Sequence, residues 1–482
     1  MNSRTRPCKQ LLPFALVILL VGGCALGPDF QEPVVVAPEA YRTRVMPADA
    51  ASDLKWWALF DDPLLYDLVT TALENNRDLK IAVSRIEQAR AVLGFTRADQ
   101  YPSVDVGAGA QTGNFTGGSR SPDTTATVYL AAPLNWEIDF WGKFKRSTDA
   151  ARAELMASEY GLKSVQLALI SEVTSTYHQL LDFHRRLDIS KSTLKSRMKS
   201  LNIIQERFDK GIIGQLDVNQ AQIQKEIAAG AIPLYERSIS KTENGLAILL
   251  GRLPESVRIK KNLQGSSPPV IPVGLPSEIL ERRPDILQAK YLLEAQTENI
   301  GVAEALRFPA ISLTGTLGVA STDLGAFTTG GGVWSIGGTL LGPLIDFGKN
   351  KRRVEIEEQK TQQALYQYEN TVLTAFREVE DALVEIVTYR QELAAIDRQQ
   401  KAAKNANHLS KERYDKGVSS FLEVLDTERT LFGADLQQSE LQQQYRNAFV
   451  NLYKALGGGW TTPSERGDAP ARTEDPLDVA TQ

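Results

Sequence analysis

Cysteine, histidine and clustered basic residues are scarce in this 482-residue chain, which has two cysteines and three histidines. His178 and His184 are six residues apart on one predicted helix, so they do not share a helical face, and His408 stands alone. This spacing is not that of a metal site. The net charge of -5 and the lack of a long basic run argue against nucleic acid as a partner.

Motifs for phosphate binding and for nucleophilic catalysis are also missing. No glycine-rich loop follows a predicted buried strand, and the glycines at 330–332 fall in a predicted loop between strands. No nucleophile elbow occurs. The sequence therefore predicts neither an enzyme nor a bound cofactor.

An apolar run near the N-terminus is too short to cross a bilayer comfortably. Residues 11–21 read LLPFALVILLV, and Arg4, Arg6 and Lys9 precede them. The sequence Val-Gly-Gly-Cys then ends at Cys24, as in a bacterial lipobox. We expect residues 1–23 to be a lipoprotein signal peptide and the thiol of Cys24 to carry lipid. An ordinary secretory signal with a chance cysteine is the less favoured alternative.

The residues on either side of Cys24 refine this expectation. Cys8 lies in the part that would be removed, so the mature chain would keep one lipidated cysteine and no disulfide. Ala25 stands where aspartate retains bacterial lipoproteins in the inner membrane, so the outer membrane is favoured. Residues 24–63 are expected to form an extended, lipid-anchored tether.

Several segments recur in the same order about 206 residues apart, which predicts two structurally equivalent halves. We place the repeats at 64–255 and 277–460, with a linker at 256–276 between them. The proline-rich, charged tail at 461–482 is expected to be disordered. The recurring pairs are RDLKIA and RPDILQA, YPSVDV and FPAISL, IDFWGK and IDFGK, and RFDKGIIGQLDV and RYDKGVSSFLEV.

Each half is predicted to contain a helix, two strands, a very long helix and a shorter return helix. Residues 143–208 contain no proline and a single glycine, and apolar residues recur there every seven positions. This pattern predicts coiled-coil packing in a rod of roughly 100 Å. Pro233 is expected to kink or interrupt the first return helix. The expected helices are 64–98, 143–208 and 216–250, then 277–306, 349–415 and 421–456.

Two seams define the coiled-coil pattern. The first recurs at Val173, Leu180, Leu187, Leu194, Leu201 and Phe208, and a partial second seam has Ile170, Tyr177 and Met198. In the second half, Val379, Ile386 and Leu393 are in register, and the seam turns polar at Gln400 and Asn407. Sustained heptads indicate helices that pack side by side.

The strand segments alternate apolar with small or polar residues, as in residues 104–110 and 311–319. This alternation fits a lipid-facing strand over a wet lumen, and equally a half-buried strand of a soluble sheet. Four strands cannot close a barrel in lipid, where open edges are forbidden. If the strands span the membrane, several chains must share one barrel, and three chains would supply twelve strands.

The chain resembles the TolC-type outer-membrane factors, in the OprM- and NodT-like lipoprotein branch of tripartite efflux pumps. The pieces that carry the resemblance span nearly the whole mature chain and occur in the family's order. They are the lipobox with GPDF, the Trp56-Trp57 entry up to Leu64, ERRPDI at 281–286, PLIDFGKNK at 343–351, and the paired RFDKG and RYDKG tips.

The resemblance implies a mainly α-helical fold with a membrane β-barrel. The implied assembly is a homotrimer whose twelve-stranded barrel crosses the outer membrane, with four strands per chain, and continues as an α-helical coiled-coil barrel. The implied partners are outer-membrane lipid, a periplasmic adaptor (membrane fusion protein) and an inner-membrane pump of the RND type. The tunnel would be closed at its periplasmic end and open when the adaptor and pump engage it.

The repeated motif is predicted to form the two helix-hairpin tips. Gly211 and Gly417 would end the long helices in a left-handed C-cap. By motif position, Glu423 and Asp426 match the family's acidic gate rings, and Tyr414 matches an aromatic that holds the closed state. Asp217 is the first-tip equivalent of Glu423. The tip residues expected to dock the adaptor are Arg207, Lys210, Gly211, Gly214, Arg413, Lys416, Gly417 and Ser419.

Two features of the second tip differ from the family pattern. Glu423 stands where aspartate is frequent, and Ser419 stands where some members carry a gate-locking arginine. A ring of carboxylates at a narrow aperture would favour cations. The alternative role for Glu423 and Asp426 is to stabilise the start of a helix through its dipole.

The sequence thus favours a passive exit duct that expels small toxic compounds or drugs. Two alternatives remain open. The same fold serves type I protein secretion, and a lipid-anchored periplasmic coiled-coil spacer without a pore would need no membrane strands. The sequence does not name the cargo, the adaptor or the pump.

Overall fold

The computed structural model describes residues 25–35, 37–43, 62–116, 119–257, 279–322 and 331–458, and the side chains among these except those at 113–126. The predicted signal peptide, Cys24, most of the predicted linker and the predicted tail lie outside the described residues. The chain divides into two compact units. The sheet unit comprises Met1–Val35, Ser84–Tyr160 and Gln288–Asn370, and the hairpin unit comprises Val36–Val83, Gly161–Leu287 and Thr371–Gln482.

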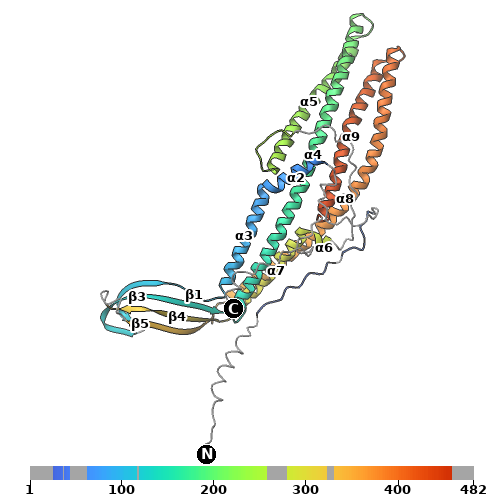
Figure 1. The fold of residues 1–482 in the computed structure, drawn as a ribbon. Helices are drawn as coiled ribbons and strands as arrows, with labels where there is room; N and C mark the ends of the chain where they lie inside the picture. Colours follow the sequence, from blue (N-terminus) through green and yellow to red (C-terminus); the bar gives the residue numbers. More distant parts are fainter. Residues whose placement is uncertain are drawn as a thin grey trace, which may run out of the picture. The chain divides into compact units, whose positions relative to one another are not determined.

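The sheet unit is built around one antiparallel sheet (Figure 1). Strand β3 pairs with β4, and β4 pairs with β5, while β1 and β2 both pair with β3. The strands are β1 (Ser103–Val104), β2 (Gly107–Thr116), β3 (Ser119–Ile138), β4 (Ala310–Ser321) and β5 (Gly331–Leu341).

The prediction of four strands per chain is wrong in one detail, because five strand segments are present in the described residues. Val104 pairs with Leu134 and Gly107 pairs with Ala131, so β1 and β2 follow one another along the same side of β3. The ladder is broken at Asp105, whose amide donates to the carbonyl of Pro133 at 3.0 Å. The first expected strand is therefore a split strand.

Between Ile138 and Ala132 of β3 the register gives the sheet one apolar face and one face of polar and small residues, and farther along β3 the second face carries Ala131–Gly318–Val333 and Tyr129–Ala320–Gly331. Paired residues of antiparallel strands point to the same side, and successive residues point to opposite sides. The apolar face has rows such as Ile138–Ile311–Leu340, Trp136–Leu313–Gly338 and Ala132–Leu317–Trp334, and the polar face has rows such as Glu137–Ser312–Thr339, Asn135–Thr314–Gly337 and Pro133–Thr316–Ser335. The predicted alternation is confirmed.

The first predicted helix is interrupted at Asn76, which corrects the expected single helix at 64–98. Helix α2 (Pro63–Asn75) ends there and α3 (Arg77–Ala98) begins. The side chain of Asn76 accepts from the amide of Leu79 at 3.0 Å and donates to the carbonyl of Leu249 at 2.9 Å. The first bond satisfies an amide in the first turn of α3, and the second satisfies a carbonyl at the C-terminal end of α5.

The equivalent helix of the second half is also split. Helix α6 (Ile279–Arg282) is followed by α7 (Pro284–Ala305), with Arg283 between them. Arg283 is buried, and its guanidinium contacts Asp285, Glu378 and the carbonyl of Ala455. This side chain therefore fixes the break by contacts with distant parts of the hairpin unit.

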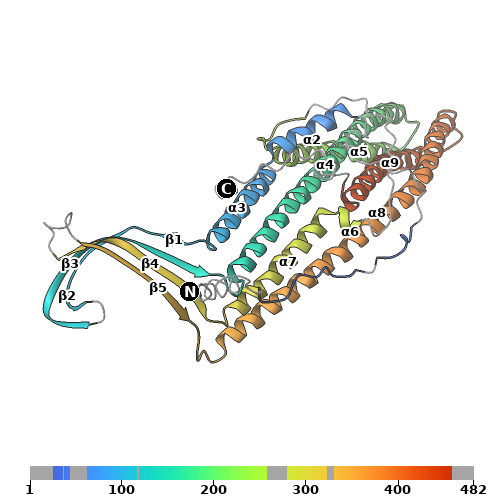
Figure 2. The same cartoon turned by 60° about the horizontal axis from the view of Figure 1, so that its bottom comes forward.

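Two helical hairpins follow the strands (Figures 1 and 2). The long helices α4 (Lys143–Asp209) and α8 (Lys349–Asp415) have 67 residues each, and the return helices α5 (Gln215–Leu249) and α9 (Phe421–Ala455) have 35 residues each. Helix α5 continues through Pro233, so the expected interruption does not occur. The equal lengths support the predicted twofold repeat.

The first half of the predicted seam, from Val173 to Leu187, lies in the core of the hairpin unit, and Leu194, Leu201 and Phe208 are half-buried. Val173 and Leu180 are fully buried, as are Ile170 and Tyr177 of the second seam. They pack with residues of α2, α5 and α9 in one apolar cluster. Met198 differs, because its side chain is 47% exposed, so the second seam does not extend to that position.

Candidate functional site at the hairpin tips

Both long helices end at a glycine in the left-handed conformation. Gly211 has φ 72° and Gly417 has φ 70°. The amide of the residue after each glycine donates a hydrogen bond to a carbonyl five positions earlier. Ile212 donates to Arg207 and Val418 donates to Arg413, both at 2.9 Å. This is the Schellman motif, whose left-handed position is rarely occupied by a residue with a Cβ. The predicted C-caps are confirmed, and they reverse the chain into α5 and α9.

An apolar cluster joins the two tips within the hairpin unit. Its buried members come from α4, α5 and α9, and Tyr414 and Phe208 pack partly buried against it. The Tyr414 and Phe421 rings lie 5.3 Å apart. The buried members are Ile204, Val218, Ala221, Phe421, Val424 and Leu425.

Arg207 crosses from the first tip to the second. Its guanidinium lies 3.3 Å from a carboxylate oxygen of Asp415 and 4.6 Å from the ring centroid of Tyr414. A cation over an aromatic face combined with an ion pair holds the planar guanidinium in one orientation. Arg207 therefore connects the two hairpins of one chain at their tips.

Each predicted gate carboxylate has an arginine of its own chain beside it. The Nε of Arg413 lies 3.1 Å from an Oε of Glu423, and a guanidinium nitrogen of Arg429 lies 2.6 Å from an Oδ of Asp426. All four side chains are between 41% and 70% exposed, so each pair is worth on the order of 1 kcal/mol or less. The sequence analysis included Arg413 as a docking residue but predicted neither of these pairings and did not include Arg429.

The two tips use their equivalent arginines differently. Arg413 pairs with Glu423 in its own hairpin, whereas Arg207 pairs across to Asp415. Asp217, the first-tip equivalent of Glu423, is half-buried in the first turn of α5. Among the described residues Asp217 forms no ion pair, so the repeat is broken in its charges while its backbone is kept.

The remaining predicted docking residues surround this contact. Lys210 and Gly214 are exposed at the first tip, and Lys416 is exposed at the second. Ser419 is half-buried, and its hydroxyl finds no hydrogen-bond partner among the described residues. The structure thus brings Arg207, Tyr414 and Asp415 together, and leaves the lysines and Gly214 at the surface.

A second polar centre, in the sheet unit, was not predicted. The guanidinium of Arg146 bonds to Glu298 at 2.8 Å, to Asp29 at 2.9 Å and to the carbonyl oxygens of Leu26 and Gly27, and its side chain is 7% exposed. These contacts hold residues 25–29 against α4 and α7. Because the partners are 117 to 152 positions away, no local sequence pattern indicates them.

No helix in the described part of the chain is both long enough and apolar enough to span a membrane. Within the same residues, His, Cys, Asp and Glu side chains form no group of three or more that is placed to hold a metal ion.

Comparison with known proteins identifies the family. The model of the outer membrane efflux protein family matches residues 68–252 and 275–458. The chain therefore belongs to this family of channels, which are not enzymes.

Named relatives and solved structures are similar over almost the full length. The solvent efflux pump outer membrane protein SrpC of Pseudomonas putida is 36% identical over 94% of this chain and 98% of its own. The probable outer membrane lipoprotein SilC of Salmonella typhimurium is 33% identical over 94% of this chain and 99% of its own. The outer-membrane channel OprN has a TM-score of 0.85 at 30% identity, over 91% of this chain and all of its own.

Proposed function

We propose that this protein is the outer-membrane exit duct of a tripartite efflux system, a passive trimeric channel that expels small toxic compounds. The observation that carries the proposal is the two-faced sheet, in which the apolar rows continue across β3, β4 and β5. A spacer that stays in water would have no use for a broad exposed apolar face.

Closure of the sheet requires further copies of the chain. The sheet of one chain leaves an edge at β5, and an open edge is not tolerated in lipid. Three copies would supply a closed twelve-stranded barrel with the apolar face outward and the polar face on the lumen. This is the trimer that we propose.

The hairpin tips are proposed as the periplasmic gate, with Glu423 and Asp426 at the narrowest point and Tyr414 and Asp217 beside them. The link from Arg207 to Asp415 and Tyr414 supports a closed state within each chain, because it ties the two hairpins together. Opening would require the two hairpins to separate at this link.

Lipidation and partners complete the proposal. Cys24 would carry lipid and anchor the chain to the outer membrane, and the similarity to a relative named as a lipoprotein supports this. The tips, with Arg207, Lys210, Gly211, Gly214, Arg413, Lys416, Gly417 and Ser419, would contact a periplasmic adaptor, which links the duct to an inner-membrane pump of the RND type.

Conductance in planar bilayers tests the duct. We expect the purified oligomer to give a small conductance, and the variant with Glu423→Ala and Asp426→Ala to give a larger conductance with less preference for cations. Glu412→Ala, a carboxylate that pairs with His408 on the same helix, is the matched control and should behave as the native chain.

Each result has a definite reading. No conductance from a well-folded oligomer in any version would overturn the duct. A conductance that the double substitution leaves unchanged would keep the pore and place its gate away from Glu423 and Asp426.

A further inference from the structure

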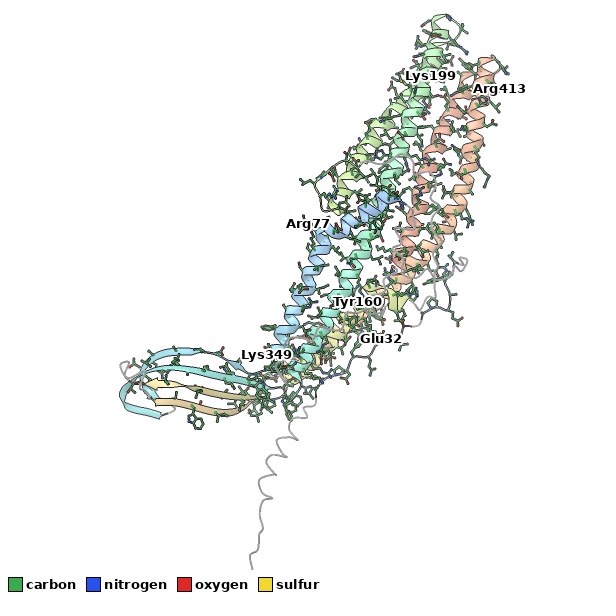
Figure 3. The ribbon with its side chains drawn as sticks, in the orientation of Figure 1. Glu32, Arg77, Tyr160, Lys199, Lys349 and Arg413 are labelled. Atoms are coloured by element: carbon green, nitrogen blue, oxygen red, sulfur yellow. The ribbon has the colours of Figure 1, made fainter. Side chains whose placement is uncertain are left out.

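The junction between β5 and α8 exposes an apolar loop followed directly by a basic run. Leu344, Ile345 and Phe347 are 95%, 75% and 98% exposed. Lys349, Lys351 and Arg352 come next at the start of α8 and are exposed too, and Figure 3 shows Lys349 at this position. Apolar side chains beside cations are the composition of segments that lie at the surface of an anionic membrane.

Phe347 has a strained backbone conformation, and its side chain gains no packing inside the described chain. Its φ is 49°, in the left-handed region that residues with a Cβ seldom occupy. Such a conformation is costly and persists only where the surroundings hold it. Because the ring is 98% exposed, the described chain supplies no packing that offsets this strain.

In the first half, the equivalent junction between β3 and α4 packs against the rest of the sheet unit. Trp141 stacks on Phe308 with ring centroids 4.6 Å apart and donates to the carbonyl of Pro309 at 2.8 Å. Lys143 pairs with Glu137, and Arg146 is buried among its partners. Lys143 and Arg146 thus serve the fold, whereas Lys145 is exposed.

The cations of the second junction are left largely free. Lys351 and Arg352 share one carboxylate, that of Glu355, and both are more than 70% exposed. The carboxylate of Asp346 accepts from the amides of Gly348 and Asn350. The second junction therefore presents an excess of positive charge to its surroundings.

The N-terminal segment indicates which part of the sheet unit would lie at the membrane surface. A Cβ on Gly142 would lie 2.7 Å from the Cα of Ala25, so the chain next to Cys24 passes against the first junction. The pairing of Ile138 with Ile311, and of Ile311 with Leu340, places the C-terminal ends of β3 and β5 side by side at one end of the sheet. A lipid on Cys24 would therefore lie near the end of the sheet that carries the β5–α8 junction.

From these observations we infer that the β5–α8 junction is a binding site for anionic phospholipid. Leu344, Ile345 and Phe347 enter the acyl chains, and Lys349, Lys351 and Arg352 contact the lipid phosphate. The inference rests on the proposed function, because it requires the sheet and the Cys24 lipid to lie in a bilayer. The site would fix the depth and orientation of the sheet in the periplasmic leaflet.

Native mass spectrometry of the detergent-solubilised oligomer, titrated with phosphatidylglycerol or phosphatidylcholine, tests the site. We expect the native oligomer to bind phosphatidylglycerol about a hundredfold more tightly, because each of the three cations contributes about a fivefold factor near an anionic lipid surface. The triple variant Lys349→Gln, Lys351→Gln, Arg352→Gln should bind both lipids equally. Lys191→Gln, Lys195→Gln, Lys199→Gln on α4 removes the same charge elsewhere and should keep the preference.

A second variant separates a lipid site from a contact between copies of the chain. Leu344→Ser with Phe347→Ser should weaken both lipids alike while the oligomer persists. Disassembly of the oligomer with unchanged lipid binding would overturn the inference and assign the loop to a subunit contact. An unchanged preference in the triple variant, or an equal loss in the α4 control, would also overturn it.

The failure of this inference is distinguishable from failure of the duct. A chain that forms no pore gives no conductance in any version. A chain that lacks the lipid site keeps its conductance in planar bilayers, and lipid binding is then the same with and without the three cations.

Discussion

At the scale of single residues, His178 shows how burial changes the chemistry of a side chain. It is 4% exposed, and its Nδ1 lies 2.9 Å from the Oδ1 of Asn447. Its pKa is lowered from 6.5 to about 4, chiefly by burial and also by the nearby charge of Arg446, while the hydrogen bond to Asn447 and the charge of Asp62 act in the opposite direction. The imidazole is therefore neutral at neutral pH.

The lowered pKa predicts a loss of stability in acid. Above pH 6.5 the imidazole is neutral in both the folded and the unfolded chain, so it adds no pH dependence. As the pH falls from 6.5 towards 4, only the unfolded chain gains the proton, and the free energy of unfolding should drop by up to roughly 3 kcal/mol. His178→Gln should remove this part of the acid destabilisation in thermal unfolding measured at pH 7 and pH 4.5.

His408 provides the control for this prediction, because its side chain is 70% exposed. His408→Gln should leave the difference between the two pH values as it is in the native chain. If His178→Gln and His408→Gln behave alike, the assigned pKa of His178 is wrong.

At the scale of elements, the hairpins show a shared backbone with different charges at each tip. The left-handed glycines end both long helices in the same way, since that ending is set by a few adjacent residues. The arginines that begin the repeated motif pair differently. Arg413 pairs within its own hairpin, and Arg207 pairs with the other hairpin. In the proposed gate, selectivity and closure should therefore be separable by substitution.

Substitution of these two arginines should have different effects on the proposed gate. Arg413→Gln leaves the charge of Glu423 uncompensated, so the preference for cations should rise in reversal-potential measurements. Arg207→Gln removes the link to Asp415 and Tyr414, so the conductance should rise with little change in preference. Lys199→Gln, on an exposed surface of α4, is the control. Identical effects of the two arginine variants would contradict this division of roles.

At the scale of the whole molecule, the described residues form a sheet unit and a hairpin unit, and each continues through the long helices into the other along the chain. The sheet unit has the two faces that a membrane wall requires, and the hairpin unit has the buried seam of a coiled coil. Membership in the outer membrane efflux protein family accounts for both features in one chain.

The proposed membrane position of the sheet predicts a difference between two neighbouring residues of β4. Leu317 is on the apolar face, opposite Ala132 and Trp334, and Thr316 is on the polar face, opposite Pro133 and Ser335. A lysine on a lipid-facing site costs roughly 2 to 4 kcal/mol near the middle of a bilayer. Leu317→Lys should reduce the amount of heat-resistant oligomer in the outer-membrane fraction, whereas Thr316→Lys should be tolerated.

The paired substitution controls for the added charge, since both variants carry the same lysine on the same strand. Equal tolerance of the two lysines would argue that neither face meets lipid. Equal loss of oligomer would indicate that β4 tolerates no lysine for reasons of strand packing.

The ends of the two long helices at the tips, the heptad seam, the alternation of the strands and the recurrence of the tip motif could be predicted from the sequence. Each of these depends on residues close together in the chain, through backbone conformation at Gly211 and Gly417 or through periodicity. The heptads predicted the buried seam at Val173 and Leu180 for the same reason.

Which charged side chains meet could not be predicted, because it depends on the three-dimensional packing. Arg207 reaches Asp415 across 208 positions, and Arg146 reaches Asp29 and Glu298 across more than a hundred. The break at Asn76 likewise depends on the carbonyl of Leu249, which lies 173 positions away. Such pairs depend on distances through space, and these are set by packing of whole helices rather than by any local pattern.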